Sequence, residues 1–78
     1  MDVRRYILKE VELQYQYKID DHVTYSKLKH LINDIFRSLK GSIMCEFGDI
    51  AELGLTDRDV KLLIKEYIEK QPDNLIKE

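Results

Sequence analysis

Residues 11–19, VELQYQYKI, alternate strictly between apolar and polar side chains. A period of two residues is typical of a β-strand with one buried face. A single strand requires a partner, because a lone strand leaves its backbone groups unpaired. This segment therefore predicts a sheet, and the position of its second strand constrains the whole fold.

The best candidate for that second strand is residues 42–47, SIMCEF, a short apolar run between Gly41 and Gly48. Such a run between glycines is typical of a buried strand, although a helical segment can have the same composition. With a helix between them, the two strands would be parallel and joined by a right-handed crossover. A third strand in the GDIAEL region, or a strand from another chain, would complete the sheet.

A strong helical pattern covers residues 24–40, where apolar side chains recur at steps of three and four. Thr24 is the expected N-cap, and Gly41 is the expected residue after the last turn. These features predict an amphipathic helix over residues 24–40.

A second helix is predicted over residues 57–70. Thr56 and Asp59 have the spacing of a capping box before an apolar stripe. Pro72 should end the helix, because a proline disfavours the helical conformation of the residue before it.

These elements predict an α+β fold in a single small domain, residues 1–78. A two- or three-stranded sheet (11–19 and 42–47) would be packed by two helices (24–40 and 57–70), with a frayed C-terminal tail from about residue 72. One alternative stays open for residues 3–10, because Val3, Ile7 and Val11 have helical spacing. If this segment were helical, the protein would be a helical bundle with one stray strand. We prefer the strand, because Tyr, Val and Ile favour pleated surfaces.

The composition, with 44% hydrophobic and 36% charged residues among 78, is typical of a soluble globular chain. A chain this short buries a small share of its surface, so it usually needs good helix packing, an oligomer or a partner. No apolar run is long enough to cross a bilayer, and no signal-peptide segment opens the chain. We therefore expect no membrane association and an intracellular location, cytoplasmic or nuclear.

The residue types that most often perform chemistry are few. Cys45 is the only cysteine, and His22 and His30 stand eight residues apart. No disulfide, metal site, glycine-rich phosphate loop or bound cofactor is expected from this set. We interpret Cys45 as a small buried apolar residue inside its run, rather than as a nucleophile. The sequence therefore predicts a protein that is not an enzyme.

Charge is distributed unevenly along the chain. The net charge is −2, with eight Lys/Arg against six Asp/Glu in residues 1–40 and five against nine in residues 41–78. Overall acidity argues against binding of nucleic acid by charge alone. The first half could still present a phosphate- or RNA-contacting face, or these residues could form a solvated helix surface of mixed charge. The candidate residues are Arg4, Arg5, Lys27, Lys29, Arg37 and Lys40.

Tyr15 and Tyr17 lie on the apolar face of the predicted strand, so we interpret them as core or partner-interface residues. Stacking on RNA bases would require them to be exposed beside basic residues. Residues 50–70 give a different alternative, because their pattern is similar to a helix-turn-helix with Arg58 and Lys61 on its second helix. Asp57 and Asp59 at the start of that helix would meet DNA phosphates unfavourably.

Residues 3–47 resemble one known group. An RRYIL opening, an alternating strand, a helix of the form LxxLIxxxFxxLxG and a short apolar strand are similar to the small ferredoxin-like protein subunits of ribonuclease P and ribonuclease MRP. The resemblance implies a non-catalytic subunit that binds a protein partner and structured RNA through Arg4, Arg5 and the first long helix. That family continues into further strands, whereas this chain continues into the helix at 57–70.

The functional hypothesis is a non-catalytic interaction subunit that acts by protein–protein association, including self-association. It could serve as an accessory protein of a ribonucleoprotein such as ribonuclease P. A short chain, an incomplete sheet edge and the lack of a chemical motif favour this interpretation. The alternative is a small DNA-binding transcriptional regulator that uses residues 50–70.

Overall fold

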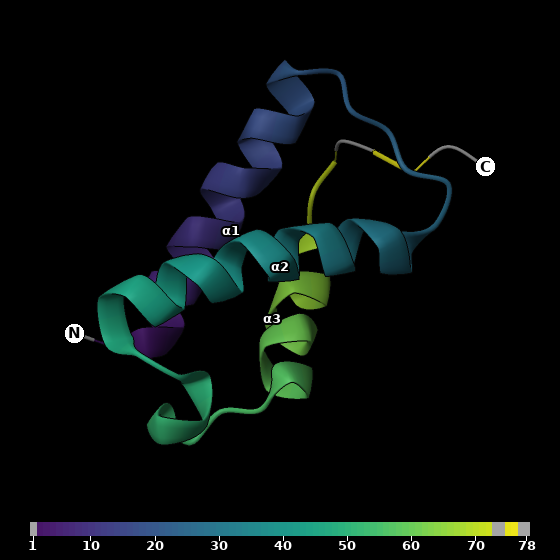
Figure 1. The fold of residues 1–78 in the computed structure, drawn as a ribbon. Helices are drawn as coiled ribbons and strands as arrows, with labels where there is room; N and C mark the ends of the chain where they lie inside the picture. The colour runs from purple at the N-terminus through teal and green to yellow at the C-terminus, as the bar shows by residue number, and fades with distance from the viewer. Residues whose placement is uncertain (1, 73–74, 77–78) are drawn as a thin grey trace.

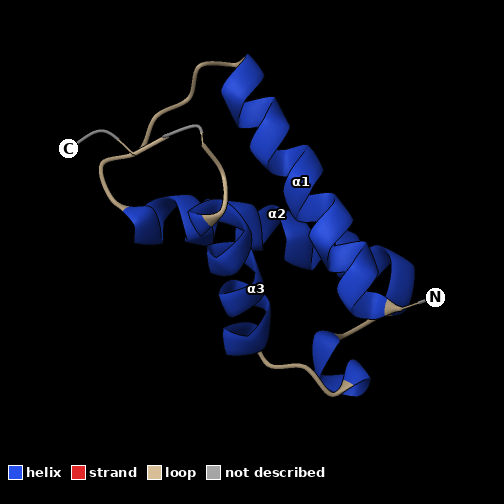
Figure 2. Cartoon of the chain, turned by 180° about the vertical axis from the view of Figure 1, so that it is seen from behind, coloured by secondary structure: helices blue, strands red, loops and turns tan. Residues whose placement is uncertain are grey.

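The structure is a computed structural model that describes residues 2–72, Leu75 and Ile76. Within these residues every regular element is a helix (Figures 1 and 2). The predicted α+β fold is therefore wrong, and the protein is all-helical. The elements are α1 (Val3–Asp20), α2 (Leu28–Phe47), the short 3₁₀ helix η1 (Ile50–Leu53) and α3 (Asp57–Glu69).

The predicted strand at residues 11–19 is the second half of α1. In a segment where apolar residues occur at every second position, they also occur at every fourth position. Residues four positions apart lie on one face of a helix, and in α1 this face is buried. Ile7, Val11 and Tyr15, four residues apart, are buried, while Leu13 and Tyr17 from the same alternation are exposed. The helical alternative for residues 3–10 is correct, and the helix extends through the segment that was assigned to a stray strand.

The predicted strand at residues 42–47 is the last part of α2. Gly41 does not end this helix, and its backbone is not in the left-handed region. The helix continues because Ile43 follows Leu39 by four residues and extends the buried face past the glycine. It ends at Gly48, whose φ of 92° is a conformation that favours glycine.

The start of the first predicted helix was placed too early. Helix α2 begins at Leu28 rather than Thr24, and its N-cap is Lys27, which makes no side-chain capping bond. Tyr25, inside the predicted helix, instead pairs with the C-terminal segment: its N–H donates to the Leu75 carbonyl at 2.8 Å. This tertiary contact holds the backbone of Tyr25 extended and delays the helix.

The second predicted helix is confirmed within one residue as α3. Its capping box is complete. The Asp59 N–H donates to Thr56 Oγ1 at 3.1 Å, and the Thr56 N–H donates to Asp59 Oδ2 at 2.9 Å. The hydrogen bonds from Thr56 also hold the pKa of the Asp59 carboxyl below its ordinary value.

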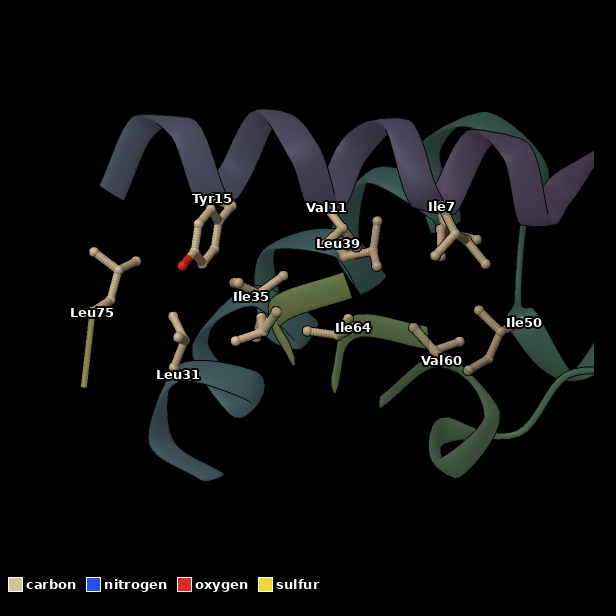
Figure 3. Close-up of a cluster of buried hydrophobic side chains, with 12 residues drawn as sticks. Ile7, Val11, Tyr15, Leu31, Ile35, Leu39, Ile50, Val60, Ile64 and Leu75 are labelled. Atoms are coloured by element: carbon tan, nitrogen blue, oxygen red, sulfur yellow. The ribbon is translucent and has the colours of Figure 1, made fainter. Parts of the chain in front are cut away.

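The three long helices pack against one another, and α2 crosses both α1 and α3 (Figure 1). Each contributes one stripe of buried residues, and in Figure 3 Ile7, Val11 and Tyr15 point from α1 toward side chains of the other helices. The stripes therefore form one apolar core without a sheet. The buried residues are Ile7, Val11, Tyr15, Leu31, Ile35, Leu39, Ile43, Ile50, Val60, Ile64, Ile68 and Leu75.

The tail returns to the connection between α1 and α2. Leu75 is buried, and Ile76 packs against the core and forms an isolated parallel bridge with Tyr25. These two residues are thus docked, in contrast to the predicted fraying from about residue 72. Residues 73, 74, 77 and 78 of that predicted tail lie outside the described residues. In the part of the chain that the structure describes, no helix combines the length and apolar character needed to cross a membrane.

Candidate functional site

A basic groove runs between α2 and α3. It consists of two hollows of about 480 and 260 Å³, and Asn33 and Lys61 line both of them. Among the described residues, no carboxylate lines either hollow, although the whole chain carries a net charge of −2. We call the following six residues the basic groove set: Lys29, Arg37, Lys40, Arg58, Lys61 and Lys65.

Helical spacing aligns these cations. On α2, Lys29, Asn33 and Arg37 follow one another at steps of four, and Lys40 continues the same side of the helix. Lys40 lies eleven residues after Lys29, so the row extends about 17 Å at 1.5 Å per residue. Arg58, Lys61 and Lys65 form the facing row on α3. The result is an elongated positive strip rather than a point site.

Phe36 holds two of the lysines at the groove. The Lys61 ammonium lies 5.0 Å from the centroid of its ring, and the Lys40 ammonium lies 5.6 Å from it. A cation is attracted to an aromatic face at this distance. Phe36 therefore concentrates positive charge where the two helices meet, and its ring is occupied by the protein's own cations.

Two members of the set also contact carboxylates at the margin of the groove. Lys40 Nζ lies 3.5 Å from Asp57 Oδ1, and Lys65 Nζ lies 3.8 Å from Glu69 Oε1. These side chains are 40–56% exposed. Exposed ion pairs of this kind contribute about 0–1 kcal/mol. An incoming phosphate can therefore compete with these carboxylates. Among the described residues, the other four groove cations form no ion pair.

The structure divides the six cations that the sequence grouped. Lys29, Arg37 and Lys40 lie together in the basic groove, whereas Lys27 sits at the N-cap of α2 and does not line it. Arg5 lines a different groove, between α1 and α3. Arg4 is close enough to Asp59 to lower the pKa of that carboxyl.

Half of the groove cations lie outside the predicted phosphate-contacting set. Arg58 and Lys61 belong to the separate helix-turn-helix alternative, and Lys65 belongs to neither prediction. Helical positions alone show that Arg58, Lys61 and Lys65 follow at steps of three and four. That this row faces α2 depends on the packing of the two helices, which sequence spacing does not specify.

The structure does not bring the two candidate tyrosines together. Tyr15 is buried, and its ring meets that of Tyr67 edge-on at 5.8 Å. Tyr17 is 58% exposed. Two residues separated by two positions point to different sides of a helix, so the common face predicted for a strand is wrong. With no sheet in the described residues, a sheet-face stacking platform is wrong as well.

A second polar cluster joins α1, the following connection and α2. Lys18 Nζ contacts Asp34 Oδ2 at 3.1 Å, and the Tyr25 hydroxyl donates to the same oxygen. These hydrogen bonds from Tyr25 and Lys18 lower the pKa of the Asp34 carboxyl. Burial raises the pKa of Tyr25, and its contact with Asp34 adds to that. All three groups are satisfied by one another, so we assign the cluster to the fold rather than to ligand binding.

Cys45 is exposed, which corrects its interpretation as a buried apolar residue. It faces away from the core because α2 continues through it, while Ile43 takes the buried position. Within the residues that the structure describes, no group of three or more His, Cys, Asp or Glu side chains has the arrangement of a metal site.

Comparison with known proteins adds no assignment. No family model, curated protein or solved structure matches this chain. The functional argument therefore depends on the grooves themselves.

Proposed function

We propose that this protein is a non-catalytic nucleic-acid-binding module that contacts the phosphate backbone through the basic groove between α2 and α3. One observation carries the proposal. In the part of the chain that the structure describes, six cations and no carboxylate line the groove, although the net charge of the chain is negative. Among the described residues, the carboxylates therefore lie outside the two hollows, and Asp57 and Glu69 contact the groove cations only at its margin.

The length of the strip favours a polymer over a small anion. A single phosphate requires a compact cradle, whereas these cations extend over about 17 Å along α2. One strand of a duplex presents a phosphate about every 3.4 Å of helix axis. The strip therefore has the length to face several phosphates of one strand.

The chemistry of the groove favours contacts to phosphates over contacts to bases. Phe36, the aromatic ring in the groove, already lies against Lys40 and Lys61 and is not presented for base stacking. Lysine and arginine contacts to the backbone position a protein without reading sequence. We therefore expect little sequence preference, with dissociation constants on the order of 10⁻⁴ to 10⁻⁶ M at physiological salt.

The proposed geometry differs from a helix-turn-helix, which presents the N-terminal part of its second helix to bases. In this protein that end of α3 carries Asp57, paired with Lys40, and Asp59, engaged in the capping box. The contact surface is instead the side of α3 that faces α2. In this arrangement Asp57 and Asp59 do not have to face the phosphates, as they would in a helix-turn-helix complex.

The test is a binding titration by fluorescence anisotropy at low salt, with labelled duplex DNA, duplex RNA and single strands. The variant Arg37→Gln/Lys61→Gln removes one cation from each helix. Each lost phosphate contact should cost a factor of about 8 at 0.1 M salt, so the double variant should bind roughly 60-fold more weakly.

The matched control is Arg4→Gln/Lys27→Gln. It removes the same charge from two residues that the sequence grouped with the patch but that do not line the basic groove. This variant should retain affinity within a few-fold. Equal losses in both variants, or no binding by the wild-type protein to any of these nucleic acids, would contradict the proposal.

A further inference from the structure

A second groove, of about 860 Å³, lies between α1 and α3. It shares no lining residue with the basic groove. Leu8 on α1 and Leu63 and Tyr67 on α3 provide apolar surface, and Leu8 is 42% exposed. Burial raises the pKa of the Tyr67 hydroxyl, as does the nearby Glu12. Its volume exceeds that of either hollow of the basic groove.

The charges around this groove are balanced, unlike those of the basic groove. Three cations and three carboxylates line it, which gives a formal charge of zero. A strongly charged polymer has no net electrostatic attraction to such a surface. A partner that also carries both positive and negative groups can pair with the charges of the groove. The charged residues are Arg5, Lys9, Lys70, Glu10, Glu12 and Glu66.

The order of charges along α1 indicates which partner fits. Arg5 precedes Leu8, and Glu12 follows it, all on the side that lines the groove. If two copies of α1 pair antiparallel about a twofold axis near Leu8, Arg5 of each copy lies opposite Glu12 of the other. Within one helix these two residues are about 10 Å apart along the axis, too far for an ion pair.

We infer that the groove between α1 and α3 is a dimer interface that takes α1 of a second copy of this chain. In this arrangement the two Leu8 side chains meet near the axis and pack toward Leu63 and Tyr67. The Arg5–Glu12 pair forms twice, because a twofold interface repeats each contact. A helix laid into an apolar groove is a common mode of protein recognition.

The dimer should be weak. Its apolar centre consists of three side chains on each copy, and its ion pairs lie at a solvated rim, where such pairs contribute little. Interfaces smaller than about 1,200 Å² in total are typical of transient association. We expect dissociation on dilution, with a constant on the order of 10 to 100 μM.

Sedimentation equilibrium on the full chain, from about 5 to 500 μM, tests the inference. Leu8→Glu should keep the protein monomeric over the range, whereas Leu13→Glu should dimerise like the wild type. Leu13 is a close match, because it is on the same helix and is 41% exposed but does not line the groove. Circular dichroism should show that both variants fold. A wild-type protein that stays monomeric at 500 μM, or equal effects of the two variants, would overturn the inference.

Charge reversal tests the register of the two helices. Arg5→Glu and Glu12→Arg should each weaken the dimer several-fold, because like charges then face each other. The double variant, Arg5→Glu/Glu12→Arg, should restore it to near the wild-type constant. Failure of the double variant to recover would reject the antiparallel pairing, even if a dimer of another geometry formed.

The inference is independent of the proposed nucleic-acid function, because the two grooves use different residues. If both hold, the dimer presents two basic grooves, and affinity for a long duplex should exceed that for a short one. This increase should disappear in Leu8→Glu while binding to the short duplex persists.

Discussion

The Tyr25 hydroxyl and the Asp34 carboxylate form a hydrogen bond that links the connection after α1 to the middle of α2. Lys18, from α1, contacts the same carboxylate oxygen at 3.1 Å. Three segments of the chain therefore meet at one ionised side chain, and the contribution of this cluster to stability must depend on pH.

The pKa of Asp34 is lowered from its ordinary value of 3.8. A carboxyl with a depressed pKa stabilises the folded state fully above its unfolded pKa, and the contribution is lost as the pH falls through its folded pKa. Asp34→Asn should therefore lower the free energy of unfolding by about 1 kcal/mol at neutral pH. The difference from wild type should shrink as the pH falls below 3.8 and through the depressed folded pKa of Asp34. Urea titrations at several pH values measure it, and a difference that is constant with pH would contradict the prediction.

His22 adopts a positive φ of 57° directly after α1. Its N–H donates to the Ile19 carbonyl and the Val23 N–H donates to the Lys18 carbonyl, which together form the Schellman pattern of a helix end. Residues other than glycine pay roughly 1 kcal/mol for this conformation. His22→Gly should therefore raise stability by up to about 1 kcal/mol in thermal unfolding. A decrease in the melting temperature would show that the imidazole makes a compensating contact.

Gly41 distinguishes the observed helix from the predicted helix end. A Cβ atom at this position would meet nothing within 4 Å, and the residue lies inside α2 with ordinary helical backbone. Gly41→Ala should stabilise the protein by about 0.5–1 kcal/mol, because glycine is a poor helix former. If the helix ended here with a left-handed glycine, the same substitution would destabilise it. Chemical denaturation measures the change in the free energy of unfolding. An increase supports a helix that continues through Gly41, and a decrease would support a helix that ends there.

Leu75 tests whether the C-terminal segment contributes to the core. Its side chain is buried at 7% exposure. Leu75→Ala should cost about 2–3 kcal/mol, near the lower end for buried leucines. Leu62→Ala, at 53% exposure, serves as the comparison and should change stability by less than about 0.5 kcal/mol. Equal small effects would indicate a tail that does not dock in solution.

The sequence predicted α3 almost to the residue, because a capping box, an apolar stripe and a proline all indicate the same helix. The prediction is wrong at residues 11–19, because the same apolar residues fit both a strand and one face of a helix. Ile7, Val11 and Tyr15 are buried against α2 and α3, which favours the helix, and this packing depends on the tertiary structure. The apolar stripe of Leu31, Ile35, Leu39 and Ile43 continues across Gly41, and this periodicity outweighs the tendency of glycine to end a helix.

The sequence predicts the two sides of the candidate site separately. The phosphate-contacting hypothesis includes Lys29, Arg37 and Lys40, whereas the helix-turn-helix alternative includes Arg58 and Lys61. Sequence spacing assigns residues to the face of a helix but does not say which faces meet. The protein combines the two rows because α2 and α3 pack side by side through their apolar stripes, which leaves their basic flanks along one groove.

The most direct test of the central claim is the salt dependence of duplex binding by the wild-type protein. Four groove cations form no ion pair among the described residues, so about four phosphates should be neutralised. The logarithm of the association constant should then fall with the logarithm of salt concentration with a slope of about −3.6 for duplex DNA. For Arg37→Gln/Lys61→Gln the slope should be about −1.8. A slope near zero, or one that the double variant leaves unchanged, would contradict phosphate binding in the basic groove.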